Sequence, residues 1–325
     1  MIGAQGSPYL SPEQWQFNFG WRYQYSDRHF TGTTQDQERD RENSQVKNTI
    51  HQLNFGRTYG WDEQTQVTIN LPYYLNERSS LDNDFPGERR YVAAHGIGDL
   101  SVVFKHWWFD TKTSTDTNFG IGYGLKLPTG EPNLQDSVKV LEDFVGDGQK
   151  DAIRIRGSTV DQSIQPGDGG FGRILDVEWF KQVGDFTPYA YAGWTFTPEG
   201  NSGVQTGRSR DGERVMSIAD SYIGRLGSMW AVTDMEGLSL GAGLRIEGVP
   251  VYDPIGKDDG FRRPGYALSA EPSAVLARGR DVFSLSVPIA LVRNRHRSVS
   301  DKENHRHGDA AFADYVLIFG WSRRF

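Results

Sequence analysis

The stretch that decides the fold is Trp15-Gln-Phe-Asn-Phe-Gly-Trp-Arg-Tyr-Gln-Tyr25. Every odd position holds an aromatic side chain, and every even position holds a polar residue or glycine. A period of two is typical of a β-strand whose two faces meet different surroundings. At about 3.3 Å per residue the stretch extends roughly 35 Å, which fits the hydrocarbon core of a bilayer if the strand is tilted by about 45°.

The same alternation recurs along the whole chain and predicts about twelve strands. In most of them one face carries large apolar side chains, and the other carries glycine, small polar or charged residues. The run 100–109 is apolar on both faces, and the run 215–230 is the weakest of the set. The predicted strands are 15–25, 51–61, 67–75, 100–109, 119–127, 171–179, 186–196, 215–230, 238–247, 266–276, 283–291 and 313–325.

Short connections alternate with long, charged ones between these strands. The short joins are 62–64, 112–116, 184–185, 233–237 and 278–280, and the long ones are 27–45, 76–96, 129–169, 199–214, 250–264 and 293–309. Outer-membrane barrels have short periplasmic turns and long extracellular loops. We therefore predict an all-β fold, a transmembrane antiparallel up-and-down β-barrel. It forms a single domain over 1–325 with both termini on the periplasmic side.

The composition agrees with such a barrel and excludes several classes of protein. Hydrophobic residues make up 37 % and the mean hydropathy is −0.59, yet 13 % of residues are aromatic and 38 are glycine. No run approaches about 20 apolar residues, so no transmembrane helix is expected. The absence of cysteine excludes disulfides, cysteine-based zinc and iron–sulfur sites, and thiol catalysis. The net charge of −7 argues against nucleic acid as a partner, and we expect no cofactor.

The two ends of the chain carry different signals. The C-terminal Gly320-Trp-Ser-Arg-Arg-Phe325 resembles the terminal signal that the barrel-assembly machinery of Gram-negative bacteria reads. The first eight residues lack the basic and apolar regions of a signal peptide. Because an outer-membrane protein needs such a peptide for export, we expect this sequence to be the mature chain with an added methionine, located in the bacterial outer membrane.

Two motifs carry a resemblance to a known family. They are His95-Gly-Ile-Gly-Asp-Leu-Ser-Val-Val-Phe-Lys105 and Asn118-Phe-Gly-Ile-Gly-Tyr-Gly-Leu-Lys-Leu-Pro-Thr-Gly130. A Gly-x-Gly-Asp segment opening a strand, and a second strand running into Lys-x-Pro-Thr-Gly, resemble the outer-membrane transporter family named for the meta-pathway of phenol degradation. The resemblance implies a barrel that moves small or hydrophobic compounds. Glycine and proline also direct the chain at strand ends, so a purely structural role for both motifs stays open.

If the aromatic face meets lipid, the other face lines the lumen. Its charges are nearly balanced, so they predict either a narrow polar channel or an interior filled by ion pairs. Lys105 and Arg225 are further candidates. The predicted lumen-lining charges are Arg22, Lys126, Asp176, Glu178, Arg245, Glu247, Glu271 and Asp314.

Two segments are candidate plugs, and the first also has a plainer interpretation. The acid-rich loop 129–169 folds inward in one interpretation, and in the other it is a solvated outer loop or binds lipopolysaccharide through divalent ions. The periplasmic segment 1–12 is the second candidate. The last loop holds His296, His305 and His307, but its many arginines favour lipopolysaccharide phosphates over a metal ion.

We predict a passive outer-membrane channel for small solutes, including hydrophobic or aromatic ones. The alternatives are a closed barrel with a structural or partner-binding role, its partner a periplasmic or surface protein, and a route for hydrophobic compounds through a lateral gap near Pro72 or Pro188. Pro72, Pro188, Pro272 and Pro288 all fall within predicted strands and predict bulges there. An enzyme is not expected, because neither His51 nor His106 has a serine at a spacing that suggests a nucleophile.

Overall fold

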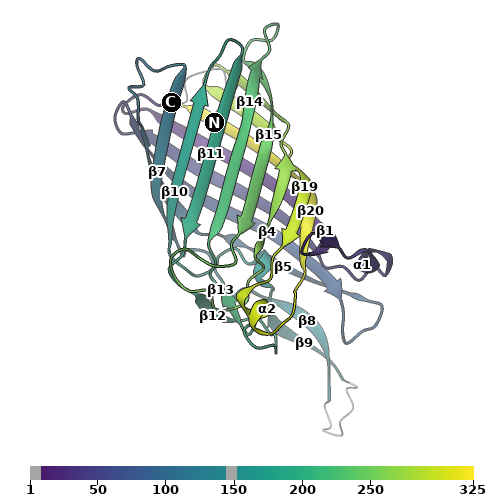
Figure 1. The fold of residues 1–325 in the computed structure, drawn as a ribbon. Coiled ribbons are helices and arrows are strands. Elements are labelled where there is room, and N and C mark those ends of the chain that lie inside the picture. Colours follow the sequence, from purple (N-terminus) through teal and green to yellow (C-terminus); the bar gives the residue numbers. More distant parts are fainter. Residues whose placement is uncertain (1–8, 144–151) are drawn as a thin grey trace.

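The computed structural model of the chain describes residues 9–143 and 152–325. These residues form a closed antiparallel barrel that is twelve strands around (Figure 1). We call each of the twelve strand positions a stave, because some of them are occupied by two shorter strands in succession. The first and last strands close the wall, because they pair from Gln16↔Arg324 to Phe30↔Ala310. Nine staves are single strands: β1 (Trp15–Thr31), β3 (Lys47–Gly60), β4 (Thr65–Leu81), β7 (Thr117–Leu127), β10 (Gly172–Lys181), β11 (Phe186–Phe196), β14 (Ser221–Ala231), β15 (Leu238–Val249) and β20 (Ala310–Arg324).

The other three staves are each broken into two strands. They are β5 (Arg89–Ile97) with β6 (Leu100–Trp107), β16 (Gly265–Ala270) with β17 (Ser273–Arg278), and β18 (Asp281–Ser286) with β19 (Ile289–Arg295). Pro272 and Pro288 stand at two of these breaks, as predicted from the missing N–H of proline. Pro188 does not behave as predicted, because it pairs in an unbroken register with Ser228. Pro72 pairs in register with Asn54 on one side, but on its other side the register shifts by one residue between Asn70↔Ser101 and Tyr73↔Ile97, so a bulge lies opposite Pro72 at the β5–β6 break, as predicted.

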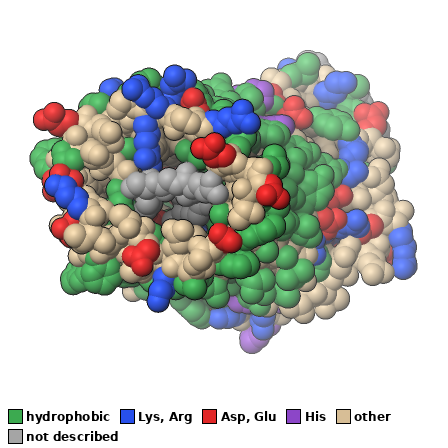
Figure 2. All heavy atoms as spheres, turned by 90° about the horizontal axis from the view of Figure 1, so that it is seen from above, with side chains coloured by type: hydrophobic (Ala, Val, Ile, Leu, Met, Phe, Trp, Pro, Cys, Tyr) green, Lys and Arg blue, Asp and Glu red, His purple; other side chains and the backbone are tan. Residues whose placement is uncertain are grey.

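Alternate residues of each strand place large apolar side chains on the outer wall. Aromatic rings meet across neighbouring strands there, as Phe19 does with Phe55 at 5.6 Å between centroids. The space-filling view from the end that holds the C-terminus shows this apolar covering on the side of the molecule (Figure 2). Many of these side chains are exposed, as a lipid-facing wall requires: Phe55, Ile69, Phe104, Tyr123, Leu125, Leu226, Leu240, Leu244 and Leu285.

Short turns gather at one end of the barrel and long loops at the other, and we call these the short-turn end and the long-loop end. Tyr9, the first described residue, and the C-terminal Phe325 both lie at the short-turn end, where they contact Ser114 and Trp15 (Figure 1). None of the helices in the described residues is long and apolar enough to cross a membrane. The long loops carry β2 (Thr34–Gln35), α1 (Gln37–Arg41), β8 (Gln135–Glu142), β9 (Ala152–Thr159), η1 (Gln162–Ile164), β12 (Asn201–Gln205), β13 (Val215–Ser217) and α2 (Val299–Glu303).

The strands run further toward the long-loop end than the alternation predicted. The predicted loop 76–96 is wrong, because its residues complete β4 and form most of β5, which pair from Tyr73↔Ile97 to Leu81↔Arg89. This part of the wall is rich in polar and charged side chains, such as Glu77, Arg78 and Arg90. Loop residues cover the inner face of β5, since Val92 and Ala94 pack against Val160 and Ile164. Apolar side chains therefore stand on both faces of the strand, and the period-two signal disappears although the pairing continues.

Candidate transport cavity

An aromatic cluster fills the lumen at the short-turn end. Tyr9, from the segment before β1, places its ring 5.0 Å from that of Trp107 and 6.3 Å from that of Phe180. Its hydroxyl donates to Ser114 O and accepts from Asn118 Nδ2. We call this group the aromatic plug: Tyr9, Trp107, Phe180, Tyr189, Met229 and Val275, all at most 7 % exposed. Residues 1–8 of the predicted N-terminal plug lie outside the described residues.

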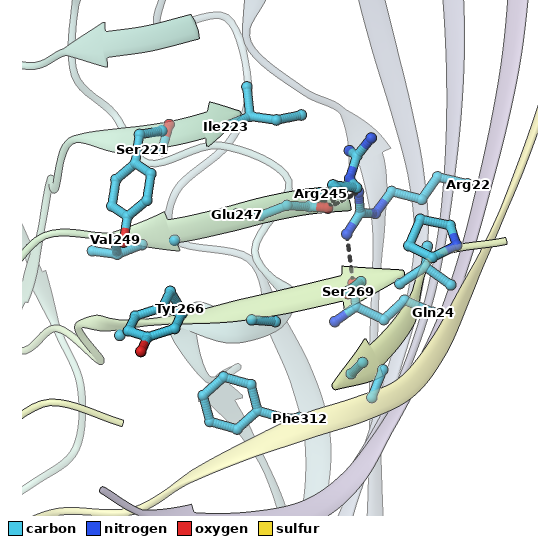
Figure 3. A pocket seen from close by; sticks show the side chains of 18 of the residues that line it. Arg22, Gln24, Ser221, Ile223, Arg245, Glu247, Val249, Tyr266, Ser269 and Phe312 are labelled. Carbon is cyan, nitrogen blue, oxygen red and sulfur yellow. Dashed lines mark hydrogen bonds and ion pairs between the residues drawn. The ribbon is translucent and has the colours of Figure 1, made fainter. Parts of the chain in front are cut away.

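A network of ion pairs, the charge belt, lies farther from the short-turn end. Glu247 binds Arg22 at 2.8 Å and Arg245 at 2.5 Å. Glu271, whose side chain is fully buried, binds Arg225 at 2.9 Å and Arg245 at 3.5 Å. Alternating charges thus neutralise one another, which the low-polarity interior of a barrel requires. Arg22 points across the lumen toward Glu247 and Arg245 (Figure 3).

A second ion-pair group lies on the neighbouring part of the wall. Lys105 of β6 binds Asp176 and Glu178 of β10, each at 3.0 Å. Gly122 of β7, between these strands, makes room for the group, since a Cβ there would lie 2.3 Å from Asp176 Oδ2. The alternation predicted that Asp176 and Glu178 lie on the inner face, with Lys105 as a further candidate. In the structure Lys105 forms an ion pair with each of the two carboxylates.

The remaining two predicted charges lie apart from these groups. Lys126 binds Asp99 at 3.3 Å and also Asp168, near the long-loop end of β7. Asp314 binds Arg293 at 2.5 Å and Arg28 at 3.3 Å and is half exposed. A register shift in the β1–β20 pairing around residues 313–316 separates Asp314 from the inward positions that precede it.

An inner cavity of about 680 Å³ opens beside the charge belt. Arg22, Arg245 and Glu247 form its polar side, and Tyr266 and Phe312 project into it (Figure 3). Aromatic and aliphatic residues make up much of the remaining lining, among them Ile174, Tyr191, Trp194, Tyr222, Ile223 and Val249. Such a cavity is large enough for a small organic molecule.

The wall of the inner cavity is incomplete between β19 and β20. The two strands pair at Ile289↔Tyr315 alone, although β19 continues to pair with β16 up to Gly265↔Arg295. The split begins at Pro288, whose carbonyl accepts from Val316 N, and it ends where Gly32 and Arg295 exchange two backbone hydrogen bonds. Residues 290–294 pair with β16 and residues 310–313 pair with β1, but the two edges do not pair with each other. We call the space between 290–294 and 310–314 the β19–β20 gap.

Small side chains flank this gap on both strands. Ala290 on β19 and Ala311 and Ala313 on β20 all line the inner cavity. Tyr315, at the base of the gap, lines the cavity and is also 49 % exposed. The Arg293 side chain spans the gap, where Nε donates to Ala313 O at 3.0 Å and the guanidinium binds Asp314.

Part of the loop 129–169 folds over the lumen at the long-loop end. Asn76 of β4 donates to Ile164 O, and Arg78 donates to Ser163 Oγ. Asp161 joins this contact through paired hydrogen bonds from Arg263 at 2.8 and 3.0 Å. Burial alone would raise the pKa of Asp161, but the charges of Arg263 and Arg78 outweigh it and hold that pKa well below its ordinary value. Residues 144–151 of the predicted plug lie outside the described residues.

Two features of the site left no clear signal in the sequence. The β19–β20 gap lies near Pro288, not near Pro72 or Pro188 as expected; the signal available was that Pro272 and Pro288 fall in adjacent predicted strands. Tyr9 of the aromatic plug lies in segment 1–12, which was a candidate plug by its position. Because Tyr9 precedes the first alternating stretch, no strand pattern indicated which side chain of that segment would enter the lumen. Among the described residues there is no group of three or more histidine, cysteine or acidic side chains able to hold a metal ion.

His51 and His106, the histidines considered for catalysis, contact a tryptophan and a threonine and not a serine in the described part of the chain. His51 accepts a hydrogen bond from Trp21 Nε1 at 3.2 Å and stacks on the Trp21 ring. His106 lies 3.1 Å from Thr65 Oγ1. Aromatic contacts of this type are usual at the interfacial girdle of a membrane barrel.

Comparison with known proteins identifies the fold. An outer membrane channel from Pseudomonas putida F1 has a crystal structure similar to this chain, with a TM-score of 0.63, 11 % sequence identity and coverage of 100 % of both chains. The CymD monoaromatic hydrocarbon channel gives a TM-score of 0.49 at 10 % identity over 97 % of this chain and 89 % of its own. The translocator domain of the autotransporter NalP from Neisseria meningitidis gives 0.47 at 12 % identity over 98 % and 91 %. These last two scores are too low to carry an argument.

No protein-family profile and no curated protein sequence matches the chain. The likeness to the Pseudomonas channel therefore rests on structure alone, and at this sequence identity it concerns the fold. The chain has the fold of a twelve-stranded barrel of the bacterial outer membrane.

Proposed function

We propose that the chain is an outer-membrane channel for the passive passage of small solutes, with hydrophobic or aromatic compounds as its main substrates. The long loops are then extracellular and the short turns periplasmic, as in other barrels of this kind. Solutes enter from the long-loop end, reach the inner cavity and leave sideways through the β19–β20 gap.

The observation that carries this proposal is the position of the inner cavity. Its lining reaches both edges of the gap, at Ala290 and Ala313. On the side of the cavity that faces the short-turn end, the charge belt crosses the lumen, and the aromatic plug occupies the short-turn end itself. An apolar solute that reaches the cavity thus finds the hydrocarbon of the membrane beside it and packed side chains beneath it. Transfer into hydrocarbon is favourable for apolar surface, so no energy source is required.

Cross-linking the gap tests this route, and the absence of cysteine in the chain makes the labelling specific. Ala290→Cys with Ala313→Cys, joined by a short bis-maleimide, closes the gap. Ser286→Cys with Ile318→Cys joins the same two staves just below it, where Ser286 and Ile318 pair directly. The first cross-link is expected to abolish protein-dependent uptake of radiolabelled toluene by cells with an intact lipopolysaccharide layer, and the second to leave it unchanged. Equal uptake with both cross-links contradicts a lateral route.

The resemblance to the phenol meta-pathway transporter family gains a structural basis from contacts between its two motifs. Asp99 accepts a hydrogen bond from Gly130 N at 3.0 Å and binds Lys126. Thr129 Oγ1 donates to Gly98 O at 2.8 Å. The two motifs thus hold the β5–β6 break against the end of β7. This contact supports membership of that family. Aromatic compounds are therefore the first substrates to test.

A closed barrel with a structural or partner-binding role is the second candidate, and the aromatic plug is the observation that favours it. This role predicts that toluene uptake does not depend on the protein and that a periplasmic or surface protein copurifies with it. Contacts with lipid and lipopolysaccharide are expected for either function, because both place the apolar wall in the outer membrane. Neither function requires catalysis.

A further inference from the structure

A second cavity lies among the long loops, and we call it the vestibule. Its volume is about 490 Å³. Six arginines line it, against two carboxylates, those of Glu213 and Asp309. The arginines come from six separate positions in the chain: Arg39, Arg78, Arg208, Arg210, Arg263 and Arg295.

Nearby acids neutralise only part of this positive charge. Asp161 binds Arg78 at 3.4 Å and Arg263 at 2.8 Å, and Arg208 lies 3.7 Å from it. Asp301 binds Arg295 at 3.2 Å. Asp309 binds Arg39 at 3.1 Å, and Glu213 binds Arg208 at 3.4 Å. Within the described residues only Arg210 of the six has no carboxylate in ion-pair range, so the excess of positive charge is small and is centred on Arg210 and on the three arginines that share Asp161.

One donor in the vestibule is both buried and unsatisfied. Arg295 is 2 % exposed, and its Nε has no hydrogen-bond acceptor among the described residues. A buried guanidinium N–H without a partner is costly. Because this Nε is closed off from the cavity, Arg295 contributes positive charge to the vestibule and not an open N–H at that atom.

The vestibule adjoins the inner cavity. Ser163, Arg263, Ala310 and Ala311 line both cavities. Beyond these shared residues the surroundings change from guanidinium groups to aromatic rings, with Tyr266 and Phe312 projecting into the inner cavity (Figure 3). A single molecule with an anionic end and an apolar body can occupy both.

We propose that the vestibule binds the carboxylate of an amphipathic organic anion, whose aromatic or short apolar body lies in the inner cavity. This inference rests on the proposed function and names the substrate class that the channel selects. Guanidinium groups bind carboxylates through charge-assisted hydrogen bonds, and the aromatic lining accepts the body by burial of apolar surface. The vestibule then acts as the selective entrance to the lateral route.

Binding of benzoate and benzamide, two molecules of nearly equal shape and different charge, tests the proposal on the purified full chain in detergent. Calorimetry is expected to show benzoate binding at least about tenfold more tightly than benzamide, since a charge-assisted hydrogen bond is worth that much. Arg210→Gln and Arg208→Gln, singly and together, are expected to weaken benzoate binding and to leave benzamide unchanged.

Arg214→Gln is the matched control, because Arg214 lies in the same loop, is exposed and does not line the vestibule. Equal affinity for the two ligands, or equal weakening by Arg214→Gln, overturns the proposal. Phosphate groups of lipopolysaccharide offer the same chemistry from another source. Variant-sensitive binding of purified lipopolysaccharide without binding of benzoate would assign the arginines to the membrane surface and also overturn it. Because calorimetry needs no transport, failure here is distinct from failure of the toluene uptake test.

Discussion

Arg22 and Glu247 meet at 2.8 Å although 225 positions separate them in the sequence. They belong to β1 and β15, and three staves lie between these strands in the wall. The ion pair therefore crosses the lumen instead of joining neighbouring strands. It forms a polar boundary between the inner cavity and the filled short-turn end, and it determines where a solute stops moving inward.

Removing the central carboxylate of the charge belt is expected to destabilise the barrel. Glu271→Gln leaves Arg225 and Arg245 close together without their shared counter-charge. Breaking a buried ion-pair network in this way typically costs about 3 kcal/mol. Urea unfolding in lipid vesicles measures the loss. Glu236→Gln, at an exposed position in a short turn, is the control, and we expect it to change the free energy of unfolding little.

The aromatic plug is expected to block ion flow. In planar bilayers the unmodified protein should show no steady single-channel current. Tyr9→Ala combined with Trp107→Ala removes the edge-to-face ring pair at the centre of the plug, and discrete current steps should appear. Trp108→Ala is the control, since Trp108 is 63 % exposed. Steady conductance of the unmodified protein would show that the lumen is open past these rings.

The Arg293–Asp314 contact is expected to restrain passage through the gap. Asp314→Asn weakens the ion pair that holds the Arg293 side chain across it, so the initial rate of toluene uptake should rise severalfold. Asp281→Asn removes a different ion pair, with Arg323 at the short-turn end, and should not alter uptake. A fall in uptake with Asp314→Asn would mean that the ion pair keeps the gap open.

Acid is expected to remove one stabilising contact of the vestibule in a defined pH range. Burial would raise the pKa of Asp309, but the hydrogen bond from His29 and the charge on Arg39 outweigh it and lower this pKa from 3.8 to about 2. Because the folded value is lower than the unfolded one, ionised Asp309 stabilises the fold above about pH 4. That stabilisation is lost as the pH falls through about 2.

The difference in unfolding free energy between the unmodified protein and Asp309→Asn isolates this effect. It should be constant from about pH 5 to 8 and should shrink below about pH 4. His29 itself receives a hydrogen bond from Val46 N at Nε2, which leaves its Nδ1 proton for Asp309. A difference that grows on acidification would contradict the assigned direction.

The sequence predicted the strands of the barrel wall better than the side-chain contacts inside the lumen. Period-two alternation arises wherever one face of a strand meets lipid, so the twelve staves and their closure followed from patterns such as 15–25. The same pattern assigned Arg22, Arg245 and Glu247 to one side of the wall, and these residues line the inner cavity. It could not reveal which of them bind one another, because their contacts cross the lumen between strands distant in the chain.

The features that define the proposed route are breaks, register shifts and loops, and a periodic sequence pattern does not predict these. The gap arises from a proline break in one stave and a register shift in the next, at Pro288 and around Asp314. Strand β5 was missed because loop residues cover its inner face, where Ala94 packs against Val160 and Ile164, so apolar residues occur on both faces. The vestibule consists of loop residues that have no period at all, and folding alone brings Arg39, Arg210 and Arg263 together.

The position of Tyr9 has a consequence for the order of assembly. Its ring contacts residues of β6 and β10, and the cluster that it joins also draws on β11, β14 and β17. Those strands must already have curled into a wall before they enclose a space for the ring. The segment before β1 therefore reaches its final place only after most of the later strands have formed.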